Sequence, residues 1–278
     1  MKTLDWSDKV AADFRSRIIV DPDNPILAFK ASRDRYTRRW PVYASLPYLG
    51  SRDSEDAVTW NVFRSLQKAQ KLGIVCDEFR IGKPLGLLLW TFAPEVDDVS
   101  AKLQYSAGML IRTFDGIFPG QTTEPDVIIL GTKAVAVIEC KLSEPEKPPA
   151  HLWEGSLDSV TKRLPIYRQA EPALLRKDVT DAQVATIYQL VRMAFYALQL
   201  GKGLSCNPVV GSLANVRNWH VQIPRLGKSA GELWDSFRDA VEAPSLRNEN
   251  TSWQHIRGLI SDRSLDELSH YLSTHPCL

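Results

Sequence analysis

The sequence predicts an α/β fold in which a mixed central β-sheet is flanked by helices. Two observations carry this prediction: an apolar β-hairpin over residues 127–138, and amphipathic helical patterns before and after it, over residues 54–71 and 180–200. The order helix, several strands, helix, strand is typical of a sheet sandwiched between helices. With 278 residues, 44% of them hydrophobic, the chain is long enough to bury a substantial core.

The first predicted helix covers residues 54–71. Ser54 suits its N-terminus, because a serine side chain accepts a hydrogen bond from the free N–H groups of the first turn. The apolar stripe at helical spacing consists of Val58, Val62, Phe63, Leu66 and Ala69. Glu55 begins this same stripe. It either favours the helix dipole from the first turn or serves a site at the buried edge of the helix.

Strands are expected after this helix. Residues 74–81 and 87–92 have strand-like composition, and a strand-like piece at 108–114 precedes a turn at 118–120. The clearest pair of strands is the hairpin, which turns at Gly131-Thr132-Lys133.

Ionisable residues mark the open end of this hairpin. Asp126 precedes its first strand, while Glu139 and Lys141 end the second. Since side chains alternate along a strand, Glu139 and Lys141 point to the same face, and the hairpin brings Asp126 towards them. Burying such charges is costly without a partner or a metal. The alternative is a surface hairpin on which the two acids simply pair with Lys141.

The chain after the hairpin is expected to be irregular over residues 143–178, where five prolines interrupt short helical pieces. Thr180 and Gln183 form a capping-box pattern that starts a helix to about Leu200. Strands are predicted at 207–213 and 219–223, and helices at 229–242 and 264–273.

These elements suggest three parts: an N-terminal extension over 1–50, a core over 51–223 with the irregular insertion at 143–178, and a C-terminal helical extension over 224–278. The net charge of +1 does not decide for or against a nucleic-acid partner. The four cysteines show no metal-ligand spacing, and the N-terminus lacks an apolar signal run, so we expect a reduced, cytoplasmic setting and no membrane span.

The N-terminal extension contains a basic cluster that includes Arg35, Arg38 and Arg39, with Tyr36 and Trp40 among them. Basic residues interleaved with aromatic ones can hold phosphates and stack on bases, so these arginines are candidates for substrate binding. The alternative is a solvated arm with two aromatic side chains packed on the body.

The hairpin resembles the PD-(D/E)xK nuclease superfamily, which has the restriction-endonuclease-like fold. The matching residues are Pro125-Asp126 and Glu139-Cys140-Lys141, and the resemblance covers residues 51–142, with a weaker extension to about residue 212. It implies a core with the order αβββαβ.

The resemblance also implies roles for individual residues. Asp126, Glu139 and the backbone carbonyl of Cys140 would hold Mg²⁺, for which Mn²⁺ could substitute, and Lys141 would position or activate the attacking water. Glu55 matches the position of a further acid near the metal. By chain order, Gln189 and Arg192 on the following helix are candidates for substrate binding.

The resulting hypothesis is a metal-dependent nuclease that hydrolyses DNA, as an endonuclease in prokaryotic restriction, defence or mobile-element processes. Two alternatives stay open: an inactive DNA-binding or assembly protein of the same fold, and a nuclease acting on RNA or branched DNA. A homodimer is an expectation from the resemblance alone. No glycine-rich phosphate loop is present in the required context, so no nucleotide cofactor is expected.

Overall fold

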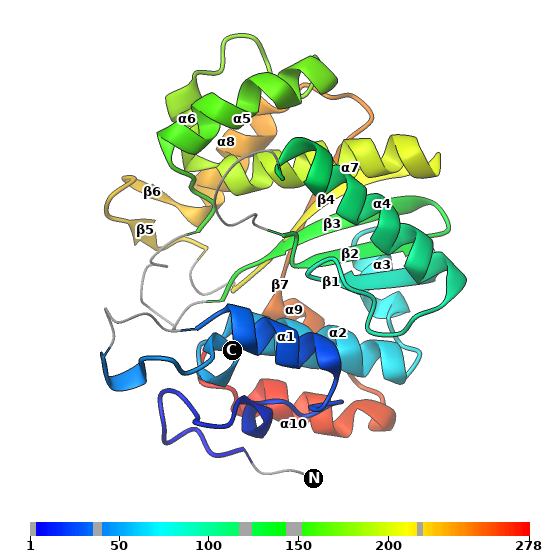
Figure 1. The fold of residues 1–278 in the computed structure, drawn as a ribbon, viewed down its shortest axis with the longest axis vertical. Helices are drawn as coiled ribbons and strands as arrows, with labels where there is room; N and C mark the ends of the chain where they lie inside the picture. Colours follow the sequence, from blue (N-terminus) through cyan, green and yellow to red (C-terminus); the bar gives the residue numbers. More distant parts are fainter. Residues whose placement is uncertain (1–3, 36–40, 117–123, 143–151, 216–218) are drawn as a thin grey trace.

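A five-stranded mixed sheet forms the middle of three layers, with helices on both of its faces (Figure 1). The computed structural model describes residues 4–35, 41–116, 124–142, 152–215 and 219–278. In spatial order the strands are β1 (Pro84–Leu89), β2 (Val127–Gly131), β3 (Ala134–Cys140), β4 (Asn207–Ala214) and β7 (Arg247–Ser252). The pairs β1–β2 and β2–β3 are antiparallel, whereas the pairs β3–β4 and β4–β7 are parallel. The predicted α/β class with a mixed, helix-flanked sheet is confirmed.

The predicted hairpin forms strands β2 and β3. Val127 pairs with Ile138 and Leu130 with Val135, and Thr132 and Lys133 connect the strands. Gly131 is required where β2 ends, because a Cβ atom there would lie 2.2 Å from the carbonyl oxygen of Ile81. The hairpin lies in the middle of the sheet, which explains why every residue of β3 is buried.

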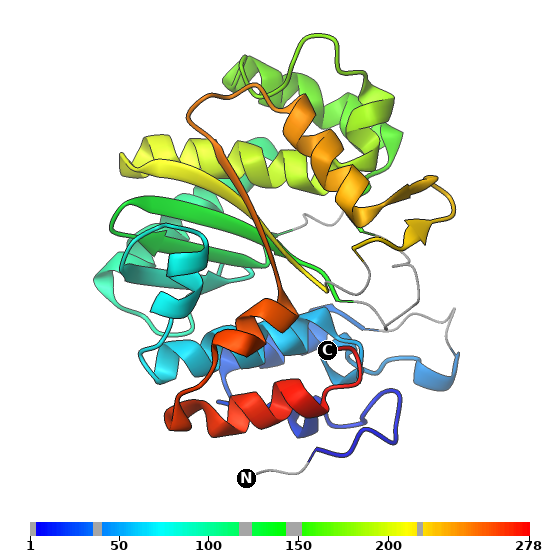
Figure 2. The same ribbon diagram turned by 180° about the vertical axis from the view of Figure 1, so that it is seen from behind.

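Alternation along β3 divides the core between the two faces of the sheet. Ala134, Ala136 and Ile138 join one apolar cluster, whereas Val135 and Val137 join the other. The first cluster lies under five helices: α1 (Pro25–Arg33), α2 (Glu55–Lys68), α3 (Gly73–Glu78), α9 (Trp253–Leu259) and α10 (Asp266–Thr274). The second is covered by α4 (Asp98–Phe114), α5 (Leu157–Ala170), α6 (Asp181–Thr186), α7 (Tyr188–Leu204) and α8 (Ala230–Ala240). Figures 1 and 2 show these groups on opposite sides of the sheet.

The N-terminal segment packs against α2. Asn61 on this helix donates to the carbonyl of Arg17 and accepts from the N–H of Ile19, and Trp60 donates to the carbonyl of Val20. Short 3-10 turns occur at Phe14–Arg17, Pro41–Tyr43, Tyr48–Gly50 and Arg263–Leu265. Ser54 caps α2 as predicted, through the N–H of Ala57.

Two segments predicted as strands are helices. Residues 74–81 contain most of α3, where Leu72, Val75, Cys76 and Phe79 are buried at helical spacing. Residues 108–114 are the last turns of α4, which begins at the Asp97 cap and buries Leu103 and Ala107. In both cases apolar composition suggested a strand, but packing at a period near 3.6 favours the helix.

Other boundaries also differ from the prediction. The expected irregular segment contains the 14-residue helix α5, with Pro165 inside it. The predicted helix over 180–200 is two helices, because Ile187 leaves the helical region at φ −128°, while the predicted capping box at Thr180 is present.

The C-terminal part differs in its strands. The strand predicted at 219–223 shrinks to β5 (Gln222–Ile223), which pairs with β6 (Lys228–Ser229) outside the main sheet. Residues 224–278 contain α8, α9 and α10, and they also supply β7 as the fifth strand of the main sheet. This polar strand was not expected.

Candidate active site at the open end of the hairpin

The structure brings together four of the residues singled out in the sequence. Lys141 is central among them: its Nζ lies 2.7 Å from Oε1 of Glu139 and 3.3 Å from Oε1 of Glu55. The other oxygen of Glu55 accepts the N–H of Leu142 at 2.9 Å. Asp126 joins the group through its Oδ2 atom, which accepts the N–H of Cys140 at 2.8 Å.

Three elements position these side chains. The hairpin places Asp126 at the start of β2 beside the end of β3, where Glu139 and Lys141 follow the same alternation. Glu55 reaches the group from the first turn of α2. The indole N–H of Trp253 donates to the carbonyl of Lys141 at 3.1 Å, so the start of α9 fixes the backbone at the end of the motif.

The site is buried and has an excess of negative charge. The side chain of Glu139 is 3% exposed and that of Lys141 is 14% exposed. When ionised, the carboxylates of Glu55, Asp126 and Glu139 oppose the single ammonium of Lys141. The Oε2 atom of Glu139 is buried and has no hydrogen-bond partner in the described chain. Such an atom carries a desolvation cost that the protein alone does not compensate.

The pKa values of these groups follow from burial and from each other's charges. Burial, assisted by Glu139 and Glu55, raises the pKa of Asp126 well above its ordinary value. Burial also raises the pKa of Glu55, to about 7, against the opposing effect of Lys141. Burial alone would lower the pKa of Lys141, but the three carboxylates outweigh it and raise that pKa well above 10.5. Lys141 is therefore a cation at neutral pH in this structure.

A second lysine lies next to this group and was missed as a site residue. Lys30 is on α1, in the N-terminal extension that contains the basic cluster, and it is buried. Its Nζ lies 2.9 Å from Asp34 and 3.3 Å from Asp56, and it also acts electrostatically on Asp126. The i,i+4 spacing to Asp34 was visible in the sequence, whereas the contact with α2 depends on tertiary packing.

The turn after β1 is strained beside the site. Trp90 and Thr91 have φ values of 50° and 71°, in the region that favours glycine. The N–H of Trp90 donates to the carbonyl of Asp126 at 3.0 Å. Its ring stacks on Trp60 at 6.0 Å and lies beneath the ammonium of Lys30 at 4.9 Å. This anchored turn fixes the backbone of Asp126.

The structure gives the other predicted site residues different surroundings. Arg35 is exposed and donates to the carbonyl of Ser45 at 2.8 Å. Arg38 and Arg39 lie outside the described residues. Gln189 is on α7, and its Oε1 atom is buried without a hydrogen-bond partner in the described part of the chain.

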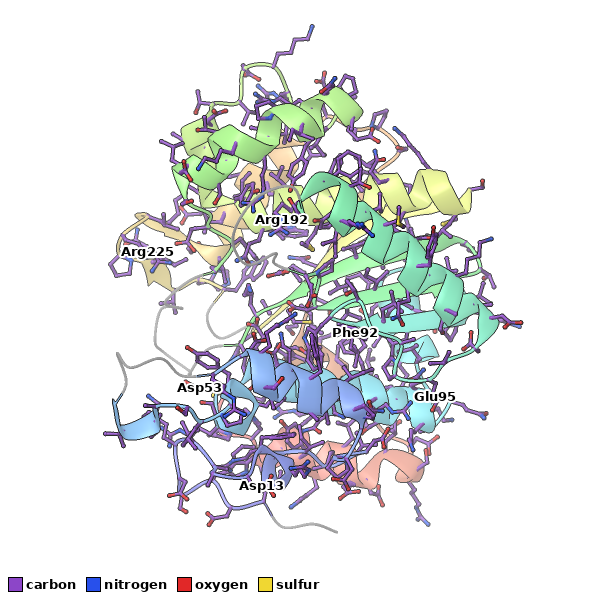
Figure 3. All side chains as sticks on the ribbon, viewed as in Figure 1. Asp13, Asp53, Phe92, Glu95, Arg192 and Arg225 are labelled. Atoms are coloured by element: carbon purple, nitrogen blue, oxygen red, sulfur yellow. The ribbon has the colours of Figure 1, made fainter. Side chains whose placement is uncertain are left out.

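Arg192 belongs to a separate buried network. Its guanidinium lies 2.7 Å from Oδ2 of Asp115, and Oδ1 of Asp115 accepts the hydroxyl of Tyr167 at 2.5 Å. Arg163 and Tyr196 complete the contacts of Asp115. This network ties α4, α5 and α7 together. Figure 3 shows Arg192 in the helical layer on the α7 side, across the sheet from Asp53 beside the start of α2.

No group of three or more His, Cys, Asp and Glu side chains within the described ranges is arranged to hold a metal ion. As the side chains lie, the ammonium of Lys141 contacts two of the three carboxylates. No helix among the described residues combines the length and apolar character needed to cross a membrane.

No protein-family model, no curated protein and no solved structure matches the chain.

Proposed function

We propose that this protein is a metal-dependent nuclease that hydrolyses phosphodiester bonds in DNA, with a PD-(D/E)xK-type site on a restriction-endonuclease-like core. The observation that carries the proposal is the convergence of Asp126, Glu139, Lys141 and Glu55 at one end of the sheet. Asp126 and Glu139 lie 13 residues apart on the hairpin, and Glu55 comes from a helix about 70 residues earlier in the chain.

The elements agree in part with the αβββαβ order that the resemblance implies. Helix α2, strands β1 to β3, helix α7 and strand β4 occur in that order. Helix α4 interrupts the three strands between β1 and β2, and α5 and α6 precede α7. Strand β7 extends the sheet beyond that core.

The chemistry of the acids fits a divalent cation. Mg²⁺ prefers oxygen ligands and usually retains several waters, so a few carboxylates suffice. Asp126, Glu139 and Glu55 would hold it, together with the carbonyl of Cys140. The buried Oε2 atom of Glu139 lacks a partner in the described chain, and the three acids outnumber Lys141, so a bound cation would favour their ionised forms. A bound Mg²⁺ would supply charge neutralisation for the phosphate and a more acidic water.

Lys141 has the role of a fixed cation in this proposal. Its ion pairs with Glu139 and Glu55 keep the ammonium at the mouth of the site. There it would offset the charge of a phosphate oxygen and orient a water by donating to it. Lys30, held by Asp34 and Asp56, would position α1 against α2 rather than touch the substrate.

A cleavage assay tests the proposal. Purified protein is incubated with supercoiled plasmid, linear duplex, single-stranded DNA and RNA, in Mg²⁺ or in EDTA. Cleavage of DNA should require the metal, and Asp126→Ala and Lys141→Ala should each lower it at least about a hundredfold. The matched controls are Asp158→Ala and Lys162→Ala, which break an exposed ion pair on α5. Circular dichroism is used to check that each variant is folded. Full activity of both site variants would overturn the proposal.

One observation favours an inactive DNA-binding or assembly protein instead. Lys141 already pairs with two of the acids, which is how a structural ion-pair cluster would be arranged. The same assay separates the two: binding to DNA without cleavage of any substrate in Mg²⁺ or Mn²⁺ would favour this alternative.

A further inference from the structure

A pocket of about 360 Å³ opens at the carboxyl end of β7, away from the acidic group. The described residues that line it are Glu78, Trp219, Asn250, Thr251, Ser252 and His255. Strand β7 is the last strand of the described sheet, so one side of its backbone faces no further strand there.

The sheet connects this pocket to the proposed catalytic group. Glu139 on β3 pairs in register with Ser212 on β4, which pairs with Asn250 on β7. Partners on parallel strands point to the same face, so these three side chains form a row across the sheet. With neighbouring strands about 4.8 Å apart, Asn250 lies roughly 10 Å from Glu139.

The middle of the row has an unexplained polar group. Ser212 is fully buried, and its hydroxyl has no hydrogen-bond partner in the described chain, like the Oε2 atom of Glu139 beside it. Ser212 and Glu139 are register partners, and each has a buried oxygen atom whose desolvation no hydrogen bond in the described chain compensates.

The pocket has the chemistry of a site for a planar, polar ring. Trp219 is partly exposed, and its ring is held edge-on against the buried Trp153 at a centroid distance of 6.3 Å. Asn250 is exposed on β7 and offers an amide donor and an acceptor to the pocket. None of the six described lining residues is a lysine or an arginine, and Glu78 is an acid, so these six do not attract a phosphate. An aromatic face beside an amide suits a nucleobase, which stacks and presents a hydrogen-bonding edge.

We propose that this pocket binds one unstacked nucleobase of the substrate strand, a proposal that rests on the proposed nuclease function. Trp219 stacks on the base and Asn250 contacts its edge. A base cannot stay paired in a duplex and also stack on Trp219, so the protein should prefer nucleic acid with an unpaired nucleotide.

Binding measurements in EDTA test this proposal without any cleavage. Fluorescence anisotropy compares a labelled duplex, the same duplex with a one-nucleotide bulge, and the single strand. Wild type should bind the bulged and single-stranded forms more tightly than the paired duplex. Base stacking contributes about 1–3 kcal/mol, so Trp219→Ala should weaken binding to these two forms by roughly 5- to 150-fold. Trp219→Phe should retain most of the affinity, and Asn250→Ala should lose part of it.

The control variant is His220→Ala, which alters the exposed neighbour of Trp219 that does not line the pocket. Equal binding of all three forms by wild type, or an unchanged preference in Trp219→Ala, would overturn the proposal. Cleavage in Mg²⁺ separates the two proposals. If the protein prefers unpaired nucleotides through Trp219 but cleaves nothing, the base-binding proposal is supported and the nuclease proposal is contradicted. If it cleaves DNA without that preference, the nuclease proposal is supported and the base-binding proposal is contradicted.

Discussion

The titration of Glu55 should make the metal-free protein less stable as the pH rises. Burial raises the pKa of this carboxyl from 4.5 to about 7 in the folded chain. Below pH 4.5 the group is protonated in the folded and unfolded chains, and above pH 7 it is ionised in both. Between these values only the folded chain holds the proton, so the free energy of unfolding falls as the pH rises.

The size of this effect follows from the two pKa values. Their difference corresponds to about 3 kcal/mol. The side chain of Glu55 is 27% exposed, and screening by solvent reduces the expected figure to about 2 kcal/mol. Ionised Glu55 also raises the pKa of Asp126, and the titration of Asp126 lowers stability with rising pH in the same way. Removing the charge of Glu55 therefore weakens this second effect as well. An effect of this size is a measurable fraction of the 5–15 kcal/mol typical of a folded domain.

The measurement is urea unfolding in EDTA at pH 5 and pH 8, for wild type and Glu55→Gln, which keeps the size of the side chain but cannot ionise. The wild-type free energy of unfolding minus that of the variant should fall by about 2 kcal/mol between the two pH values. Burial lowers the pKa of His275 to about 3, which makes stability rise with pH up to about 6.5. That contribution is present in both proteins and cancels in the difference. The control is Glu267→Gln, an exposed acid on α10. A difference that stays flat or rises with pH would refute the reasoning.

Two further predictions concern stability away from the acidic group. Asp115→Asn should lower the free energy of unfolding by about 3–5 kcal/mol, because it removes the counter-ion of the buried Arg192. Asp178→Asn, in an exposed ion pair with Arg176, should leave the free energy of unfolding nearly unchanged, and urea unfolding measures both variants. Gly131→Ala should lower the melting temperature and cost about 1–3 kcal/mol of stability, because the added Cβ would meet the carbonyl of Ile81. Gly203→Ala adds a Cβ in open space at the end of α7 and should be neutral or stabilising in the same thermal scan.

Features that depend on residues close in sequence were predictable. The hairpin, its turn and the shared face of Glu139 and Lys141 follow from alternation over about 15 residues. The cap at Ser54 and the capping box at Thr180 follow from four-residue patterns. Its own pattern identified Glu55 as an acid on the buried edge of a helix, and the resemblance placed it near the metal. Its contact with Lys141 depends on how α2 packs against the sheet.

The errors arose where packing overrides local composition. The segment at 108–114 contains Met, Leu, Ile and Phe in a short apolar run, and a window of that length does not distinguish a strand from the end of a helix. The start signal of α4 is Asp97, more than ten residues earlier. Strand β7 has the sequence Arg-Asn-Glu-Asn-Thr-Ser, without apolar alternation. Backbone pairing with β4 holds this strand in the sheet, and such pairing cannot be predicted from a pattern of side chains.

This division explains which parts of the site the sequence could indicate. Asp126, Glu139 and Lys141 are placed by one hairpin, so their convergence is a local property. Lys30, Ser212 and Asn250 come from α1, β4 and β7, and only the folded sheet puts them beside that hairpin. The nonlocal residues change the chemistry that can be inferred. The hairpin alone is compatible with a surface cluster of ion pairs, whose members would be well solvated and would have ordinary pKa values. Burial under α2, with an oxygen of Glu139 and the hydroxyl of Ser212 left without partners, is costly for a purely structural cluster. Under the proposed function, a bound cation would supply a partner for the buried oxygen of Glu139 and so account for part of that cost.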